Sequence, residues 1–260
     1  MNPFYIKYGT WALITGASSG IGEQFCRQLA ELKFNLIFVA RRKEKLEVLK
    51  EELKSQHGIE VKIIAIDISQ SNFLKEIREV TDSLHIGLLI NNAGFALTGN
   101  FLDHQLEDEI SLLNVNCRAP LMLSHHFGKK MSDRRKGGII NVASASAFLP
   151  MPYWTNYAAS KAYNLHFSNG LWYELKEKGI DVLALCPGAT QTEFSKVAGT
   201  KNGGMESAAV VKLALNNLGK KSTVVAGFSN QFITFLMKFI PRQTLIRVGA
   251  KVISGMVQKL

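Results

Sequence analysis

The chain has 260 residues and a formal net charge of +10, a length that fits one α/β domain or a small pair of domains. Eight basic residues and no acidic residue lie between Ser207 and the C-terminus, so the first 206 residues are close to neutral and do not suggest a nucleic-acid binder. Three cysteines without C-x-x-C spacing and six histidines without ligand spacing argue against a metal site and indicate a reducing compartment.

The N-terminus does not read as a targeting segment. Residues 1–7 lack the long apolar run of a signal peptide. No stretch reaches the roughly 18 uncharged apolar residues of a spanning helix. We therefore expect a cytoplasmic protein.

A glycine-rich turn follows the first predicted strand. Trp11 to Thr15 is a short apolar run typical of a buried parallel strand, and the pattern from Ile21 to Leu32 is helical. Glycine allows a sharp turn close to a pyrophosphate, and the start of the next helix offers unpaired N–H groups. The spacing differs from G-x-G-x-x-G and alone fits a simple tight turn equally well. The expected cofactor contacts are Gly16, Ser18, Ser19, Gly20, Ile21 and Gly22.

The second predicted strand, 35–40, ends about 20 residues further on, where NAD-binding folds carry an acid for the ribose 2′-hydroxyl. Here Ala40 holds that place, and Arg41 and Arg42 follow. A guanidinium would bind a 2′-phosphate through charge-assisted hydrogen bonds, worth roughly 1.5–3 kcal/mol each, so the sequence favours NADP(H). Arg42 fits the start of a solvated helix equally well, whereas Arg41 is the preferred phosphate ligand.

Polar and small residues follow the third and fourth predicted strands, 60–66 and 88–90. A carboxylate after the third strand can accept a hydrogen bond from an adenine amino group, and small residues after the fourth leave room for the cofactor. We expect Asn91 to tie strands together rather than to contact a ligand. The cofactor contacts expected here are Asp67, Ile68, Asn92, Ala93 and Gly94.

A phenol and an ammonium are one helical turn apart. Residues 156–177 read as a helix that carries Tyr157 and Lys161, and residues four apart on a helix are neighbours. A free tyrosine has a pKa of about 10, too high for efficient acid–base catalysis at neutral pH, and a nearby ammonium lowers that pKa. Ser144 ends the fifth strand at the edge where open α/β sheets bind ligands, and Ser146 is a rival on spacing alone.

Six strand-like runs alternate with helical patterns, and Ser222 to Ala226 makes a seventh. No linker rich in Pro, Gly or Ser separates two halves. Alternating βα units require a parallel sheet with helices on both faces. We therefore expect one α/β domain with a doubly wound, seven-stranded parallel sheet over residues 1–228, and C-terminal amphipathic helices over 229–260 that belong to the same domain.

Together these motifs resemble those of the classical short-chain dehydrogenase/reductase family, in NADP(H)-preferring bacterial-type members related to 3-oxoacyl and hydroxysteroid reductases. The similarity covers the chain from Trp11 to Ala226. It implies a Rossmann fold and an enzyme that interconverts a ketone and its alcohol. It also implies that Tyr157 is the general acid in reduction, that Lys161 lowers the pKa of that phenol and holds the nicotinamide ribose, and that Ser144 orients the carbonyl.

Further roles come only from the resemblance. Asn116 is similar to the family's helix asparagine that supports a proton-relay water, and only the residues that follow it favour it over Asn114. Thr192 would contact the nicotinamide amide or the pyrophosphate. The family also implies a homodimer or homotetramer, paired through helices 112–127 and 157–175. The other implied cofactor contacts are Pro187, Gly188 and Thr190.

The residues expected around the substrate are apolar, and no arginine stands among them to clamp a small carboxylate. The expected substrate is therefore a hydrophobic carbonyl compound or alcohol. The subgroup that the chain resembles includes, more distantly, membrane-associated reductases of long-chain 3-oxoacyl and steroid compounds. The glycine-rich loop 197–204 is expected to be a lid. The expected pocket residues are Phe95, Ser144, Phe148, Met151, Trp154 and Phe194.

The C-terminal segment 229–260 mixes basic with apolar residues, and Pro241 is expected to split it into two short helices. Basic amphipathic helices can lie on an anionic membrane, but packing over the pocket or at a dimer contact is the preferred alternative, because structural amphipathic helices are so common. Two other functions stay open. One is a catalytically idle nucleotide-binding regulator, which the intact Ser144, Tyr157 and Lys161 argue against. The other is a membrane-docking protein that works through its tail.

Overall fold

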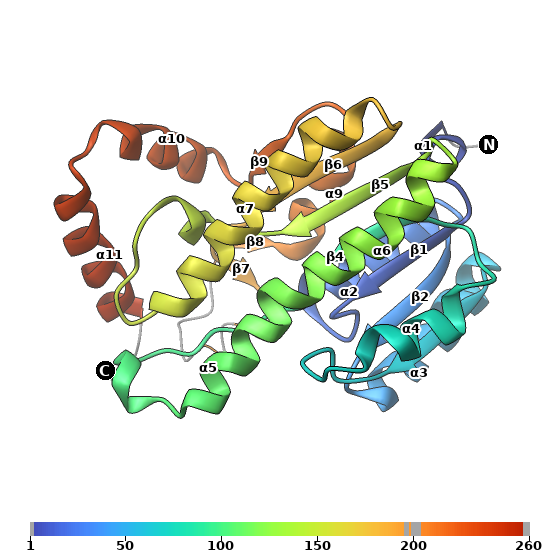
Figure 1. Cartoon of the computed structure of the whole chain (residues 1–260), viewed down its shortest axis with the longest axis horizontal. Coiled ribbons are helices and arrows are strands. Elements are labelled where there is room, and N and C mark those ends of the chain that lie inside the picture. The colour runs from blue at the N-terminus through green and yellow to red at the C-terminus, as the bar shows by residue number, and fades with distance from the viewer. Residues whose placement is uncertain (1–2, 195–197, 199–203, 257–260) are drawn as a thin grey trace.

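The computed structural model of the protein describes residues 3–194, 198 and 204–256 (Figure 1). Within these residues a seven-stranded sheet has the order β3-β2-β1-β4-β5-β6-β9, and every neighbouring pair is parallel. This order confirms the predicted doubly wound Rossmann fold. The strands are β1 Trp11–Thr15, β2 Asn35–Ala40, β3 Val61–Ala65, β4 Ile86–Asn91, β5 Gly137–Val142, β6 Ile180–Cys186 and β9 Thr223–Val225.

Helices cover both faces of the sheet (Figure 1). Ile14 of β1 packs on the face covered by α2, α3 and α9, whereas its neighbour Leu13 packs on the face covered by α4, α6 and α7. The central strands are buried on both sides, which is why they read as continuous apolar runs without alternation. The helices are α2 Gly20–Glu31, α3 Lys43–His57, α4 Phe73–Thr81, α5 Leu106–Leu113, α6 Ala119–Asp133, α7 Thr155–Lys176 and α9 Ser207–Asn217.

Three short elements were not expected. A helix α1, Pro3–Tyr8, precedes the sheet, and the strands β7, Thr190–Gln191, and β8, Met205–Glu206, pair as a small second sheet. Tyr8 is buried at the amino ends of the strands, where its hydroxyl donates a hydrogen bond to Asp181 at 2.7 Å. The helix α1 therefore covers the sheet at the end opposite to that where ligands bind in such folds.

The C-terminal segment is helical, as predicted, and breaks at Pro241. The helix α10, Phe228–Leu236, runs into the 3₁₀ turn η4, Met237–Phe239, and α11 covers Arg242–Met256. Figure 1 shows α11 at the end of the molecule where α7 begins, and Ile253 of α11 is fully buried there. Among the described residues, no helix combines the length and the hydropathy needed to cross a bilayer.

Candidate active site

The glycine turn between β1 and α2 has the backbone geometry that glycine permits. Gly16 and Gly20 have φ angles of 68° and 60°, in the left-handed region that side chains disfavour. A Cβ atom at Gly22 would collide with the carbonyl oxygen of Gly16. The side chain of Ser19, the N-cap of α2, makes no capping hydrogen bond, so the first N–H groups of α2 stay available to an anion. The turn thus fits the pyrophosphate of a dinucleotide.

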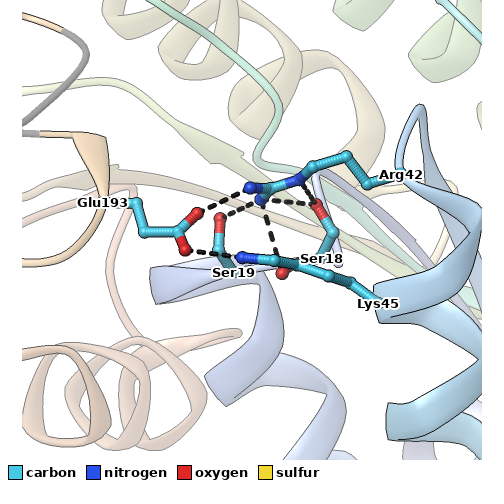
Figure 2. Close-up of polar contacts among 5 residues, drawn as sticks. All are labelled: Ser18, Ser19, Arg42, Lys45 and Glu193. Atoms are coloured by element: carbon cyan, nitrogen blue, oxygen red, sulfur yellow. Dashed lines mark hydrogen bonds and ion pairs between the residues drawn. The ribbon is translucent and has the colours of Figure 1, made fainter.

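A cluster of charged side chains lies beside this turn (Figure 2). Arg42 donates hydrogen bonds to the hydroxyls of Ser18 and Ser19 at 2.9 and 2.8 Å. Its Nη1 also donates to one carboxylate oxygen of Glu193 at 2.7 Å, and Lys45 donates to the other at 2.6 Å. These bonds from Lys45 and Arg42 lower the pKa of Glu193 to about 2.

Arg41, the preferred phosphate ligand from the sequence, lies outside this cluster. Its side chain is 76% exposed, and its Nη1 is 3.8 Å from Asp67 Oδ2. Sequence reasoning missed Lys45, although it follows Arg42 by one turn of α3 and so lies on the same helix face. It also missed Glu193, which no local pattern connects to Arg42, 151 residues away.

The residues after β3 and β4 lie at the same edge of the sheet. Asp67 Oδ1 accepts a hydrogen bond from the backbone of Ser69 at 2.9 Å, and Ile68 is buried. The Thr15 hydroxyl accepts hydrogen bonds from the backbone N–H groups of Asn92 and Ala93 at 3.0 and 3.1 Å. Thr15 therefore holds the segment after β4 against the glycine turn.

The Asn91 side chain hydrogen-bonds to other buried side chains of the core. Its amide donates to Asn141 Oδ1 at 2.7 Å and to Ser124 Oγ at 3.0 Å. Asn141 donates in turn to Ser168 Oγ at 2.9 Å. This network joins β4 and β5 to α6 and α7.

Asn116 lies in a π-helical turn, Asn114–Arg118, between α5 and α6. The side chain of Asn116 is wholly buried. It accepts a hydrogen bond from Phe95 N at 3.1 Å and donates to Phe95 O and Ser160 Oγ at 3.0 Å. Its main-chain oxygen accepts a hydrogen bond from Asn164 at 2.8 Å, so Asn116 is fixed between α7 and the segment after β4. A Cβ atom at Gly94 would lie 3.1 Å from its Oδ1.

Ser144, Tyr157 and Lys161 come together from β5 and α7. Lys161 Nζ donates to Val142 O at 2.8 Å and lies 5.7 Å from the centre of the Tyr157 ring. Burial lowers the pKa of Lys161 to about 8. Burial raises the pKa of Tyr157 to about 12, against a smaller lowering by its hydrogen bond with Ser144. The Ser144 hydroxyl also accepts from the backbone of Ser146 at 3.1 Å.

The sequence predicts a lowered pKa for Tyr157, but in this structure the net shift raises that pKa. The phenol is 6% exposed, and removal from water disfavours the charged phenolate. The ammonium of Lys161 is bound to a backbone carbonyl rather than to the phenol.

Apolar residues surround Tyr157. The Trp154 ring meets it edge-on at 5.1 Å, and the Phe194 ring lies 5.6 Å away. Phe148, expected in the same pocket, instead packs in a separate cluster with Leu165 and Cys186. Described members of the cluster around Tyr157 also include Phe95, Ala96, Leu97, Leu112, Leu149, Met151, Tyr153, Ala158, Ala198, Met237 and Ile253.

The predicted lid 197–204 lies outside the described residues except for Ala198 and Gly204. The Thr98 hydroxyl donates to Ala198 O at 2.8 Å and accepts a hydrogen bond from the indole of Trp154 at 2.6 Å. The start of α7 is thus connected, through Thr98, to Ala198.

The segment after β6 reaches back to the glycine turn. Pro187 O accepts a hydrogen bond from Ala145 N at 2.7 Å, and the Thr190 hydroxyl donates to Gly188 O at 3.0 Å. Thr192 lies directly over Gly20, where an added Cβ atom would come within 2.9 Å of its Cγ2. Within the described residues, no group of His, Cys, Asp and Glu side chains could hold a metal ion.

Comparisons with known proteins agree with this geometry. The family model "short chain dehydrogenase" matches residues 10–203. A very-long-chain 3-oxoacyl-CoA reductase of Podospora anserina is 35% identical over 223 residues, which are 84% of this chain and 66% of that protein. A 7beta-hydroxysteroid dehydrogenase of Collinsella aerofaciens is 32% identical over 86% of this chain and 89% of its own length.

Solved structures agree as well. A structure from work on the stereoselectivity of 7beta-hydroxysteroid dehydrogenase superposes with a TM-score of 0.90 at 29% identity. The superposition covers 96% of this chain and 99% of the other chain. A short-chain dehydrogenase from Sphingobium yanoikuyae in complex with NADPH has a TM-score of 0.79 at 30% identity and covers 90% of this chain and 97% of its own. Fold, site geometry and sequence identity all lead to one conclusion: the chain belongs to the short-chain dehydrogenase/reductase family and is an oxidoreductase.

Proposed function

We propose that the protein is an NADP(H)-dependent reductase that interconverts a hydrophobic ketone or 3-oxoacyl compound and its secondary alcohol. The observation that carries this proposal is the position of Tyr157, which bonds to Ser144, lies one helical turn from Lys161 and is enclosed by Trp154 and Phe194. A proton donor is thereby held inside an apolar site, beside a hydroxyl that can orient an oxygen atom of the substrate.

The residues of this site divide the acid–base chemistry among them. The nicotinamide cofactor, when bound, supplies or accepts the hydride. In reduction the Tyr157 hydroxyl donates its proton to the substrate oxygen, which a hydrogen bond from Ser144 orients. The Lys161 ammonium then stabilises the phenolate, and Asn116 holds α7 and the segment of Phe95 in register. In oxidation the phenolate is the base that accepts the proton.

The charges beside the glycine turn support NADP(H) as the cofactor. Arg42 and Lys45 stand together beside Ser18 and Ser19, and Ala40 replaces the acid that would repel a 2′-phosphate. The NADPH complex of the Sphingobium enzyme supports the same cofactor at 30% identity. We assign the remaining dinucleotide contacts to the glycine turn, to residues 67–68 and 92–94, and to the segment 187–192.

The apolar surroundings of Tyr157 support a bulky hydrophobic substrate, and so do the names of the relatives, which act on 3-oxoacyl-CoA or hydroxysteroid compounds. The tail 229–260 is proposed to belong to the same domain as residues 1–228, and the packing of Met237 and Ile253 in the cluster around Tyr157 supports this. In this tail Phe228, Phe232, Phe235 and Phe239 are exposed, and so is Lys238, which supports a peripheral contact with an anionic membrane.

A homodimer or homotetramer is the proposed assembly. The helices expected to pair carry large exposed apolar side chains, among them Leu113, Leu121 and Tyr163. We also propose a cytoplasmic location, since the described cysteines are all free thiols and reducing compartments maintain that state.

Replacement of Tyr157 tests the proposed chemistry against the idle-regulator alternative. A purified Tyr157→Phe variant should bind NADPH normally and lose carbonyl reduction by about 10²- to 10⁴-fold, the usual contribution of a positioned acid. A screen of bulky ketones, followed by NADPH absorbance, measures the rate. Tyr163→Phe on the same helix is the matched control and should retain full activity. Wild-type protein that binds NADPH and reduces none of the ketones would favour the regulator.

A further inference from the structure

In the cluster beside the glycine turn, the basic side chains already bind an anionic group, the carboxylate of Glu193. The two carboxylate oxygens of Glu193 accept from Arg42 at 2.7 Å and from Lys45 at 2.6 Å, and Figure 2 shows this carboxylate facing the ends of both basic side chains. Arg42 reaches from Glu193 to the hydroxyls of Ser18 and Ser19. Only the two basic groups bond to the carboxylate, but the two hydroxyls beside them are further hydrogen-bond donors, and together they suit a phosphate monoester.

The carboxylate is held loosely enough to be exchanged. The side chains of Glu193, Arg42 and Lys45 are 43%, 44% and 46% exposed, and exposed ion pairs contribute little to stability because water screens them. A phosphate monoester carries about −1.5 to −2 charges at neutral pH, against one on the carboxylate. A phosphate monoester should therefore displace the Glu193 carboxylate from Arg42 and Lys45.

The neighbouring residue connects this exchange to the rest of the site. Thr192 packs over Gly20 at the start of α2, where the pyrophosphate would bind. Phe194, on the other side of Glu193, packs against Tyr157. Release of Glu193 would thus free a segment that touches both the glycine turn and the catalytic tyrosine.

We propose that Glu193 occupies the position of the cofactor's 2′-phosphate and competes with it for Arg42 and Lys45. Lys45 is then a cofactor ligand that determines specificity, and Glu193 is an internal competitor whose displacement links cofactor binding to its neighbours Thr192 and Phe194. The inference rests on the proposed preference for NADP(H). It assigns the phosphate to Arg42 and Lys45, rather than to the exposed Arg41.

Binding of two small nucleotides, measured by isothermal titration calorimetry, tests the competition without turnover. Adenosine 2′,5′-bisphosphate carries the 2′-phosphate, and 5′-AMP lacks it. In Glu193→Gln the Kd for the bisphosphate should fall by roughly 5- to 10-fold, the equivalent of the two lost pairs, while the Kd for 5′-AMP stays within about twofold. Lys45→Met should weaken binding of the bisphosphate alone.

Glu44→Gln is the matched control. Glu44 is exposed on α3 beside Lys45, and its replacement changes the net charge by the same amount as Glu193→Gln. This variant should leave both Kd values nearly unchanged. If Glu193→Gln weakens the bisphosphate, Glu193 is a clamp on the bound cofactor and the inference is wrong. The inference is also wrong if Glu193→Gln lowers the Kd of both nucleotides equally, or if Glu193→Gln and Glu44→Gln change the Kd values equally. Wild-type protein that binds both nucleotides equally would instead contradict the proposed NADP(H) preference itself.

Discussion

Burial shifts the two central titratable residues of the site toward their neutral forms. It lowers the pKa of Lys161 to about 8 and raises the pKa of Tyr157 to about 12. The protein thus bears the cost of keeping an ammonium inside an apolar site at neutral pH. That cost is understandable if the ammonium is needed to stabilise a phenolate for the moment that Tyr157 has lost its proton.

This burial predicts how stability changes with pH. Above about pH 8 the folded chain releases the Lys161 proton, whereas the unfolded chain keeps it to about pH 10.4. The unfolded state therefore binds more protons in this window, so the free energy of unfolding rises with pH. Relative to Lys161→Met, wild type should gain about 2 kcal/mol between about pH 7 and about pH 9.5.

Urea unfolding of both proteins at several pH values measures this difference, because the titration of groups far from Lys161 contributes equally to both proteins and cancels. The window stops below pH 10, where Tyr157 begins to act with the opposite sign. A constant difference between wild type and Lys161→Met would show that Lys161 titrates equally in the folded and unfolded chains.

What the sequence could predict at this scale was local. The turn from Gly16 to Gly22 and the pair Tyr157 and Lys161 are patterns within a few consecutive residues, where spacing fixes geometry. Contacts between distant segments were beyond it. Glu193 meets Arg42 across 151 residues, and the separate packing of Phe148 depends on how the loop after β5 turns.

At the scale of elements, the seven parallel strands and their crossover helices followed from the alternation of apolar runs with helical patterns. The helix α1 escaped prediction because six residues are too few to show a helical period. The π turn that contains Asn116 escaped it for a similar reason. The π turn spans only five residues, too few to reveal a changed helical period in the sequence.

The unexpected α1 should matter for stability and not for chemistry. Tyr8→Phe removes a hydrogen bond to the carboxylate of Asp181, and bonds to charged groups contribute about 1.5–3 kcal/mol. We expect the free energy of unfolding to fall by about that amount in urea titrations. The kcat/KM should stay unchanged, because α1 covers the amino ends of the strands and the site lies at their carboxyl ends.

Tyr5→Phe is the control on the same helix, since the Tyr5 hydroxyl makes no hydrogen bond within the described part of the chain. Its ring contact with Phe34 would be kept. Equal losses of stability in Tyr5→Phe and Tyr8→Phe would argue that the helix tolerates neither change, and that the bond to Asp181 is not the reason.

For the whole molecule, the C-terminal tail has a buried part and an exposed part. In α11, Ile253 is fully buried in the cluster around Tyr157. In α10 and η4, Phe232 is 57% exposed and Phe239 is 73% exposed, and these two residues are called the outer side of the tail. The sequence presented pocket cover and membrane contact as alternatives, because periodicity does not tell which partner each side of a helix meets. The structure makes them separable by point substitution.

Membrane contact is the last prediction. Full-length protein should sediment with vesicles that contain phosphatidylserine, because exposed phenylalanines enter the interface and each nearby basic residue adds about 1 kcal/mol. Binding should weaken from about 0.1 M to about 1 M salt, as the Debye length falls from about 10 Å to about 3 Å. Phe232→Ser with Phe239→Ser should abolish sedimentation and leave KM for a bulky ketone unchanged. Ile253→Ala should raise that KM and leave sedimentation intact. Wild-type protein that does not sediment with the vesicles would contradict the membrane contact. A changed KM in the serine pair would show that Phe232 and Phe239 act on the pocket.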